Sequence, residues 1–315
     1  MKKDKNPPSK GEGLVWVSRR SLVLLKKEAD SIPLKAVKVR SQNSGGYLSR
    51  FKGRGMEFDE ARPYQPGDDV RTIDWRVTAR RGETHTKLFR EERDRSVIFW
   101  VDFRAPMYFA TRGAFKSVFA AKAAAALGWS ARIQGERLGG LAFSEDGHKE
   151  VRPATGDHAV MNLIRMLADY SEKKPAETSP KARRDAIRNS LARLRRVARP
   201  GSLIFLISDF RGLDRQCEHH FRALAPHNDL VLLHLFDRLE ADLPKAGYYR
   251  VKGSQRNLLL NASDKHRRAE HRDKFQRHHD SIEDLCRRYR MHQLACSTED
   301  DVLDILRQGL GRRPR

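Results

Sequence analysis

The feature that most constrains the fold is a set of short, uninterrupted apolar runs separated by segments of helical pattern. Residues 203–207 and 230–233 are entirely apolar, and residues 96–101 are nearly so. Continuous apolar strands are typical of a parallel sheet that is buried on both faces. We therefore predict an α/β fold with a doubly wound, Rossmannoid sheet, in which strands alternate with helices.

The periodicity places these elements along the second part of the chain. We expect strands at 96–101, 137–143, 202–208, 229–236 and 291–296, and extended pieces at 149–152, 247–251 and 257–260. Helices are expected at 113–134, 157–170, 180–197, 213–224, 264–290 and 299–310. In the helix at 180–197, Ile187, Leu191 and Leu194 form the predicted buried stripe.

Several polar residues follow the predicted strands. In doubly wound folds, ligands bind outside the carboxyl ends of the strands, where the strand order reverses. We expect Asp102, Thr155 in the 154–156 loop, Asp209 and Asp237 to lie at that edge.

Three parts are expected along the chain: a tail at 1–13, an N-terminal helix with a β-rich extension at 14–95, and the α/β domain at 96–315. Leu22, Leu25 and Ala29 have helical spacing, and Pro33 marks the end of that helix. Within the extension, 73–77 and 84–89 are predicted to pair as a hairpin around Gly82.

Composition limits the classes of function. The formal net charge of +22 favours anionic partners, but the basic residues are spread among 41 acids, and no finger spacing or RNA-binding signature occurs. No apolar run approaches the roughly 20 residues of a membrane span, and no signal peptide is recognisable, so we expect a cytoplasmic protein. Cys217, Cys286 and Cys296 have no close spacing and are predicted to be reduced, structural thiols.

Residues 53–92 form a dense block of Gly, Pro, Asp and Arg with one Trp. Its charged residues could form a catalytic cluster, but we favour a structural ion-pair network. They are Arg62, Asp68, Asp69, Arg71, Asp74, Arg76 and Arg80. No nucleophile elbow, P-loop, dinucleotide fingerprint or zincin motif occurs in the chain, so no enzymatic activity is predicted.

This block, with residues 207–211 and 237–249, resembles the bacterial domain-of-unknown-function family 58, over about residues 14–310. The motif residues are Gly53, Gly55, Glu57, Phe58, Arg62, Tyr64, Pro66, Gly67, Asp68, Arg71, Asp74, Trp75 and Arg80. The resemblance implies a von Willebrand factor A-like domain preceded by a β-rich extension, in proteins often encoded beside MoxR-type AAA+ ATPases. It also implies an adaptor role, with such an ATPase and its client proteins as partners.

A von Willebrand A domain commonly binds Mg²⁺, and the resemblance places the ligands at Asp102, Thr155 and Asp209. Where the family pattern has Asp-x-Ser-x-Ser, however, this chain has Asp102-Phe-Arg104-Ala-Pro106. Proline has no side-chain oxygen, and a guanidinium repels a cation. We therefore predict that Arg104 pairs with Asp102 and Asp209 in place of the metal, and that the protein has no cofactor.

Two other functions remain open. The net charge would suit a nucleic-acid-associated protein, and Asp102, Asp209 and Asp237 would suit a metal-dependent hydrolase. Asp237 and Glu240 could also act as an acid/base pair, although a polar loop is the preferred interpretation. His266, His271, His278 and His279 are expected on a solvated helix face, because their spacing does not favour a metal site.

Overall fold

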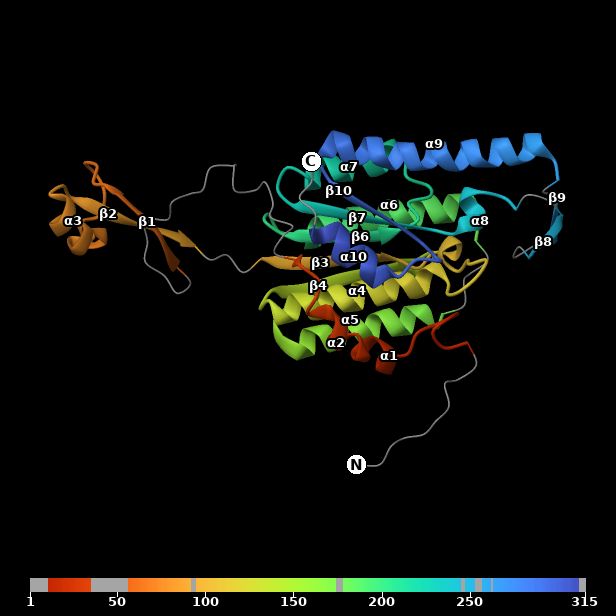
Figure 1. The fold of residues 1–315 in the computed structure, drawn as a ribbon, viewed down its shortest axis with the longest axis horizontal. Coiled ribbons are helices and arrows are strands. Elements are labelled where there is room, and N and C mark those ends of the chain that lie inside the picture. Colours follow the sequence, from red (N-terminus) through yellow and green to blue (C-terminus); the bar gives the residue numbers. More distant parts are fainter. Residues whose placement is uncertain are drawn as a thin grey trace, which may run out of the picture. The chain divides into compact units, whose positions relative to one another are not determined.

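The structure is a computed structural model that describes residues 11–34, 56–91, 95–173, 178–244, 247–252, 257–261 and 263–311. The chain divides into two compact units. One contains residues 1–41 and 95–315, and the other contains residues 42–94. Figure 1 shows the elements of both units.

A six-stranded sheet forms the centre of the larger unit, with the strand order β10-β7-β6-β3-β4-β5. All pairs are parallel except β4 with β5, which form an antiparallel hairpin. The strands are β3 (Ser96–Asp102), β4 (Arg137–Ser144), β5 (Gly147–Ala154), β6 (Leu203–Ser208), β7 (Asp229–Phe236) and β10 (His292–Ser297). Along the chain, β3 is the first strand of this sheet, and β4 and β5 follow on one side of it. The chain then returns to the other side of β3, where it forms β6, β7 and β10. The predicted doubly wound fold is confirmed, and the strand order reverses between β3 and β6.

Helices cover both faces of this sheet (Figure 1). Val97, Phe99 and Val101 of β3 belong to one hydrophobic core with residues of α4 (Lys116–Ile133), α5 (Gly156–Ser171) and α10 (Val302–Gly311). Ile98 and Trp100 belong to the other core, with residues of α6 (Pro180–Val197), α7 (Arg215–Leu224) and α9 (Lys265–Tyr289). The two-residue period of a strand thus divides β3 between two cores, which explains its continuous apolar sequence.

The N-terminal helices pack on this larger unit. The single helix predicted from the sequence is two short ones, α1 (Arg19–Leu24) and α2 (Lys26–Ala29), and Leu22 and Ala29 are fully buried. Trp129 of α4 donates a hydrogen bond of 3.2 Å from Nε1 to the carbonyl oxygen of Leu22. The predicted part at 14–95 therefore spans two units of the structure: its N-terminal helices belong to the larger unit, and residues 42–94 form the smaller one.

The smaller unit contains β1 (Met56–Pro63), the 3-10 turn η3 (Val70–Thr72), α3 (Trp75–Arg81) and β2 (His85–Glu91). Of the predicted hairpin of 73–77 with 84–89, one antiparallel bridge between Ile73 and Thr86 is present. The rest is wrong, because β2 pairs with β1 and residues 75–81 form a helix. The Asp74 carboxylate caps this helix by accepting from the backbone N–H groups of Arg76 and Val77, and Gly82 ends it with a φ of 74°. A local capping signal at each end therefore prevails over the strand pattern.

The remaining elements are η4 (Ala105–Met107), α8 (Arg238–Ala241) and an antiparallel pair, β8 (Tyr248–Lys252) with β9 (Asn257–Asn261).

The three cysteines are free and buried, and burial raises the pKa of Cys217 to about 11 and those of Cys286 and Cys296 to about 12. Within the described ranges, no helix has the length and apolar character needed to cross a membrane.

Candidate functional site

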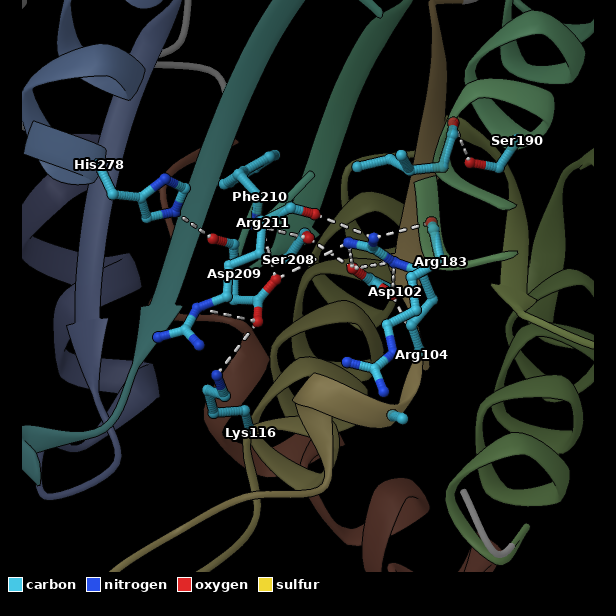
Figure 2. A network of polar contacts seen from close by, with 12 residues as sticks. Asp102, Arg104, Lys116, Arg183, Ser190, Ser208, Asp209, Phe210, Arg211 and His278 are labelled. Carbon is cyan, nitrogen blue, oxygen red and sulfur yellow. Dashed lines mark hydrogen bonds and ion pairs between the residues drawn. The ribbon is translucent and has the colours of Figure 1, made fainter. Parts of the chain in front are cut away.

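Two buried carboxylates mark the reversal point of the sheet. Asp102 ends β3, and Asp209 directly follows Ser208, the last residue of the neighbouring strand β6. Asp102 is 0% exposed and Asp209 is 1% exposed. Figure 2 shows that the side chains around them converge from the sheet and from both helical layers. The predicted position of these two acids is confirmed.

Arg104 neutralises Asp102 in a forked contact. Its Nη2 lies 2.6 Å from Asp102 Oδ2, and its Nε lies 3.0 Å from Oδ1. The Ser208 hydroxyl donates a further hydrogen bond of 2.6 Å to Oδ2, and the backbone N–H of Arg104 donates one of 2.9 Å to Oδ1. Asp102 therefore has its acceptor positions filled by groups of the protein itself.

The other N–H groups of the Arg104 guanidinium contact further segments around Asp102, Arg104 and Asp209, and this region at the strand ends is called the crevice below. Nη1 donates to the backbone carbonyl oxygens of Arg183 at 3.1 Å and Arg211 at 3.0 Å, and Nη2 lies 3.7 Å from Asp209 Oδ1. Burial alone would lower the pKa of Arg104, but the neighbouring carboxylates, Asp102 foremost, outweigh burial and raise it. The predicted pairing of Arg104 with Asp102 and Asp209 is confirmed.

A second buried cation, which the sequence analysis missed, is Lys116. It is the first residue of α4 and is 0% exposed. Its Nζ lies 3.3 Å from Asp209 Oδ2, and 2.9 and 3.0 Å from the two carboxylate oxygens of Glu240 in α8. The signal for it was weak: one lysine at the start of an alanine-rich, buried helix, whose partners come from distant segments.

Asp209 stays ionised because it lies between these cations. Its burial would raise its pKa, but Lys116, Arg104 and Arg211 outweigh burial and hold the pKa well below its ordinary range. The backbone after it turns sharply, since Phe210 has a φ of 53°, and the Phe210 N–H donates to the Ser208 hydroxyl at 2.8 Å. Within this turn the backbone N–H of Arg211 donates to Asp209 Oδ1 at 3.0 Å.

Asp237 follows β7 at the same edge but has its own set of partners. Its carboxylate accepts from Thr111 N at 2.8 Å, from Thr298 Oγ1 at 2.6 Å, from Leu239 N at 2.9 Å and from the Thr111 hydroxyl. Glu240 accepts from the Asp237 N–H at 3.0 Å, which completes a capping box on α8. The polar loop preferred for Asp237 and Glu240 is wrong, because Asp237 caps helix α8 and Glu240 lies within that helix.

Thr155 does not lie at this edge, and that prediction is wrong. Because β5 runs antiparallel to β4, its carboxyl end lies beside the start of β4, and Ala154 pairs with Leu138. Thr155 is exposed there as the N-cap position of α5, at the opposite edge of the sheet from Asp102. Reading β5 as a member of the parallel set would place the loop at the wrong end.

The residues at the crevice do not fit the Mg²⁺ ion that the family resemblance implies. The oxygens of Asp102 and Asp209 face Arg104 and Lys116, and Pro106 offers no donor. Among the described residues, no group of three or more His, Cys, Asp or Glu side chains is arranged to hold a metal. Mg²⁺ needs several unshared oxygen ligands.

The histidines of α9 correct another prediction, because only His266 lies on the solvated face. His278 Nε2 lies 2.9 Å from the carbonyl oxygen of Asp209, and His271 Nε2 lies 2.9 Å from that of Leu239. Since a carbonyl oxygen can only accept, both rings donate. His279 packs against His234 of β7, with 5.6 Å between the ring centroids. These histidines attach α9 to the sheet.

The charged block of the smaller unit forms fewer ion pairs than predicted. Arg62 pairs with Asp68 at 2.8 Å, and Lys87 lies 3.8 Å from Asp74. Tyr64 donates to the backbone of Asp68, Pro66 and Gly67 form the expected turn, and Asp69 caps η3. Trp75 is 68% exposed, and the side chains of Arg71, Arg76 and Arg80 are exposed and form no ion pair with the described residues. Gly53 and Gly55, and the side chains of Glu57 and Phe58, lie outside the described residues.

Fold and site together define a class of protein: a doubly wound α/β domain whose crevice carboxylates are neutralised by its own arginine and lysine. The family model described as "Protein of unknown function DUF58" matches residues 60–281, and the chain belongs to this family. The family predicted from the motifs is thus confirmed.

Relatives and solved structures extend this comparison. Uncharacterized proteins of Mycobacterium tuberculosis and Mycobacterium bovis are each 30% identical over 203 residues, 64% of this chain and 62% of the relative. The chain thus spans less than two thirds of the length of these relatives. Similar solved structures include BatB from Bacteroides thetaiotaomicron, with 10% identity, a TM-score of 0.38, and coverage of 69% of this chain and 97% of that one. Another is a von Willebrand factor type A protein from Catenulispora acidiphila, with 10% identity, a TM-score of 0.36, and coverage of 72% and 43%.

Proposed function

We propose that this protein is a non-enzymatic adaptor that binds an acidic segment of a partner protein at the crevice edge. The observation that carries the proposal is the pairing of Asp102, Asp209 and Glu240 with Arg104 and Lys116. This arrangement neutralises the buried charges of the crevice from within the protein. Charges that are already paired favour a role in recognition at the exposed rim over a role in chemistry.

The hydrogen bonds of the acids support a binding role. A general base needs a free acceptor within reach of the proton that it removes. Asp102, Asp209 and Asp237 each accept hydrogen bonds from structural donors or contact a buried cation. The hydrolase alternative would require these acids to exchange such partners for a metal or a substrate.

The charge at the rim of the crevice indicates the chemistry of the partner. The side chain of Arg211 is 50% exposed, and Arg112 is exposed next to Thr111, which bonds to Asp237. With a net charge of +22, the whole chain attracts acidic surfaces and increases the rate of encounter with them. A carboxylate-rich protein segment would meet both arginines at this rim.

The resemblance on which the family was recognised suggests a MoxR-type AAA+ ATPase as this partner, with client proteins handled by the pair. Membership of the family supports the suggestion. An adaptor of this kind would present its client to the ATPase for remodelling or for the maturation of a complex.

The test is the binding of the purified chain to a purified MoxR-type ATPase from the same organism, measured by calorimetry at moderate salt. The double variant Arg112→Glu/Arg211→Glu should weaken binding by about tenfold or more, because two attractive contacts become repulsive. The matched control is Arg165→Glu/Arg277→Glu on the exposed faces of α5 and α9, which should bind as the wild type does.

Equal losses in both double variants would show that only net charge matters and would reject the crevice rim as the binding surface. Absence of ATPase binding, together with DNA binding that falls steeply with salt, would favour the nucleic-acid alternative.

A further inference from the structure

Glu240, in the four-residue helix α8, contacts two cations that come from distant parts of the chain. Its carboxylate lies between Lys116 Nζ, at 2.9 and 3.0 Å, and Arg211 Nη2, at 3.2 Å. The side chain of Glu240 is 10% exposed, whereas Lys116 is fully buried beneath it and Arg211 is 50% exposed above it. Glu240 therefore closes a cationic site whose outer wall faces solvent.

We propose that Lys116 and Arg211 form a carboxylate-binding site that the chain's own Glu240 fills, and that a partner's Asp or Glu side chain takes the site by displacing Glu240. This inference rests on the proposed function, in which an acidic segment binds at the crevice rim. It assigns one atomic position to the partner's acid: the position that the Glu240 carboxylate holds.

The charges of the crevice require an anion at this position. Its cations are Arg104, Lys116 and Arg211, and its carboxylates are Asp102, Asp209 and Glu240. With Glu240 turned away, the buried ammonium group of Lys116 would keep one carboxylate contact among the described residues, that with Asp209 at 3.3 Å, and Asp209 also lies within 4 Å of Arg104 and Arg211. An unpaired buried charge is strongly unfavourable, so the site would bind another carboxylate in its place.

Glu240 is also the most easily replaced of the three acids. Asp102 and Asp209 are fixed at the ends of strands, and their side chains are 0% and 2% exposed. Apart from the two cations, Glu240 is held through its carboxylate by one backbone N–H, that of Asp237. The backbone of α8 has separate supports: His271 donates to the Leu239 carbonyl oxygen at 2.9 Å, and Arg272 pairs with Asp242 at 2.9 Å. The Glu240 side chain can therefore rotate outward while α8 stays in place.

The alternative is that Glu240 has a structural role only, as the capping-box residue that stabilises the start of α8. The two hypotheses differ in whether a variant without the Glu240 carboxylate binds a small carboxylate from solution. A carboxylate site emptied by truncation takes up a small carboxylate from solution, whereas a lost helix cap gains nothing from it.

The direct test uses Glu240→Ala and acetate as the probe. We expect the Tm of this variant to rise with acetate concentration and to saturate, by a few degrees above a chloride control of equal ionic strength, since a ligand that binds only the folded state stabilises it. The wild type should show no difference between the two salts, and Glu240→Ala/Arg211→Ala should lose the acetate effect. The matched control is Glu299→Ala, which removes an exposed partner of Arg238. Equal responses of Glu240→Ala and Glu299→Ala would overturn the inference.

A second measurement uses the isosteric variant Glu240→Gln, which serves if the alanine variant does not fold. Its affinity for the MoxR-type ATPase should be about fivefold or more above that of the wild type, because the internal competitor has lost its charge. Unchanged affinity would contradict displacement while leaving the proposed adaptor function intact. Acetate rescue without any ATPase binding would support the carboxylate site and reject the proposed function instead.

Discussion

At the scale of single residues, Arg104 has more partners than any other side chain in the crevice. It joins the carboxylates at the ends of β3 and β6 to the backbone carbonyl oxygens of Arg183 and Arg211, and it is 1% exposed. A buried ion pair can cost more to desolvate than it gains, so its effect appears mainly when one partner is removed. The main effect of Arg104 is therefore to neutralise Asp102 and Asp209, so that these two carboxylates can stay ionised while buried.

From this we expect Arg104→Met to lower the free energy of unfolding by about 3–5 kcal/mol, since Asp102 would remain buried without its cation. Urea denaturation followed by circular dichroism measures the change. The double variant Arg104→Met/Asp102→Asn should lose clearly less than the single variant. A double variant as unstable as the single one would contradict this account.

The site residues divide according to what a sequence can reveal. Asp102, Asp209 and Asp237 could be predicted because each directly follows a recognisable strand. Arg104 could be predicted because its charge is incompatible with the expected metal. The contact of Lys116 with Glu240 joins residues 124 positions apart, and no local pattern encodes it. Such a pair depends on where the chain brings the start of α4 to α8, which only the folded structure defines.

At the scale of elements, the same distinction explains the successes and errors in the fold. The buried strands and amphipathic helices of the α/β domain were predictable because hydrophobic periodicity identifies both. Thr155 was misplaced because periodicity does not reveal the direction of β5. The strand at 73–77 was wrong because Asp74 and Gly82, which are helix-capping residues, received less weight than the alternating pattern around them.

The contact between β7 and α9 leads to a prediction about pH. His234 packs against Phe275, His278 and His279 of α9, and burial, with the positive charge of nearby groups, lowers its pKa from 6.5 to about 3, although Asp209 opposes this. Between these two pH values the unfolded chain binds a proton at His234 that the folded chain does not. Stability should therefore be lost progressively as the pH falls from about 6.5 toward 3.

The measurement is urea denaturation of the wild type and His234→Phe at pH 7, 6, 5 and 4. The free energy of unfolding of the variant should fall less steeply over this range, because phenylalanine does not titrate. Parallel curves would show that His234 does not contribute to the pH dependence.

At the scale of the whole molecule, the dominant quantity is the net charge of +22, which remains after the ion pairs are formed. Self-repulsion of this size opposes the compact state, and salt screens it over about 8–10 Å at 0.10–0.15 M. The crevice pairs, which are almost fully buried, are screened much less.

We therefore expect the Tm to rise by about 2–4 °C when NaCl is increased from 0.02 to 0.3 M, which corresponds to about 1 kcal/mol for a domain of this size. Differential scanning calorimetry measures the shift, and sucrose of equal osmolality controls for general solute effects. A Tm that falls with salt would mean that surface ion pairs outweigh the repulsion.

The edge strand β5 affects whether two molecules can join their sheets side by side. Among the described strands, β5 pairs with β4 alone, and an edge of this kind is the usual starting point for joining two sheets. The strand carries Lys149, Glu150 and Arg152, followed by Pro153, which lacks an N–H group. A second chain approaching this edge would have to desolvate those charges and would find a donor missing from the ladder. The residues of β5 therefore oppose the joining of two molecules along this edge of the sheet.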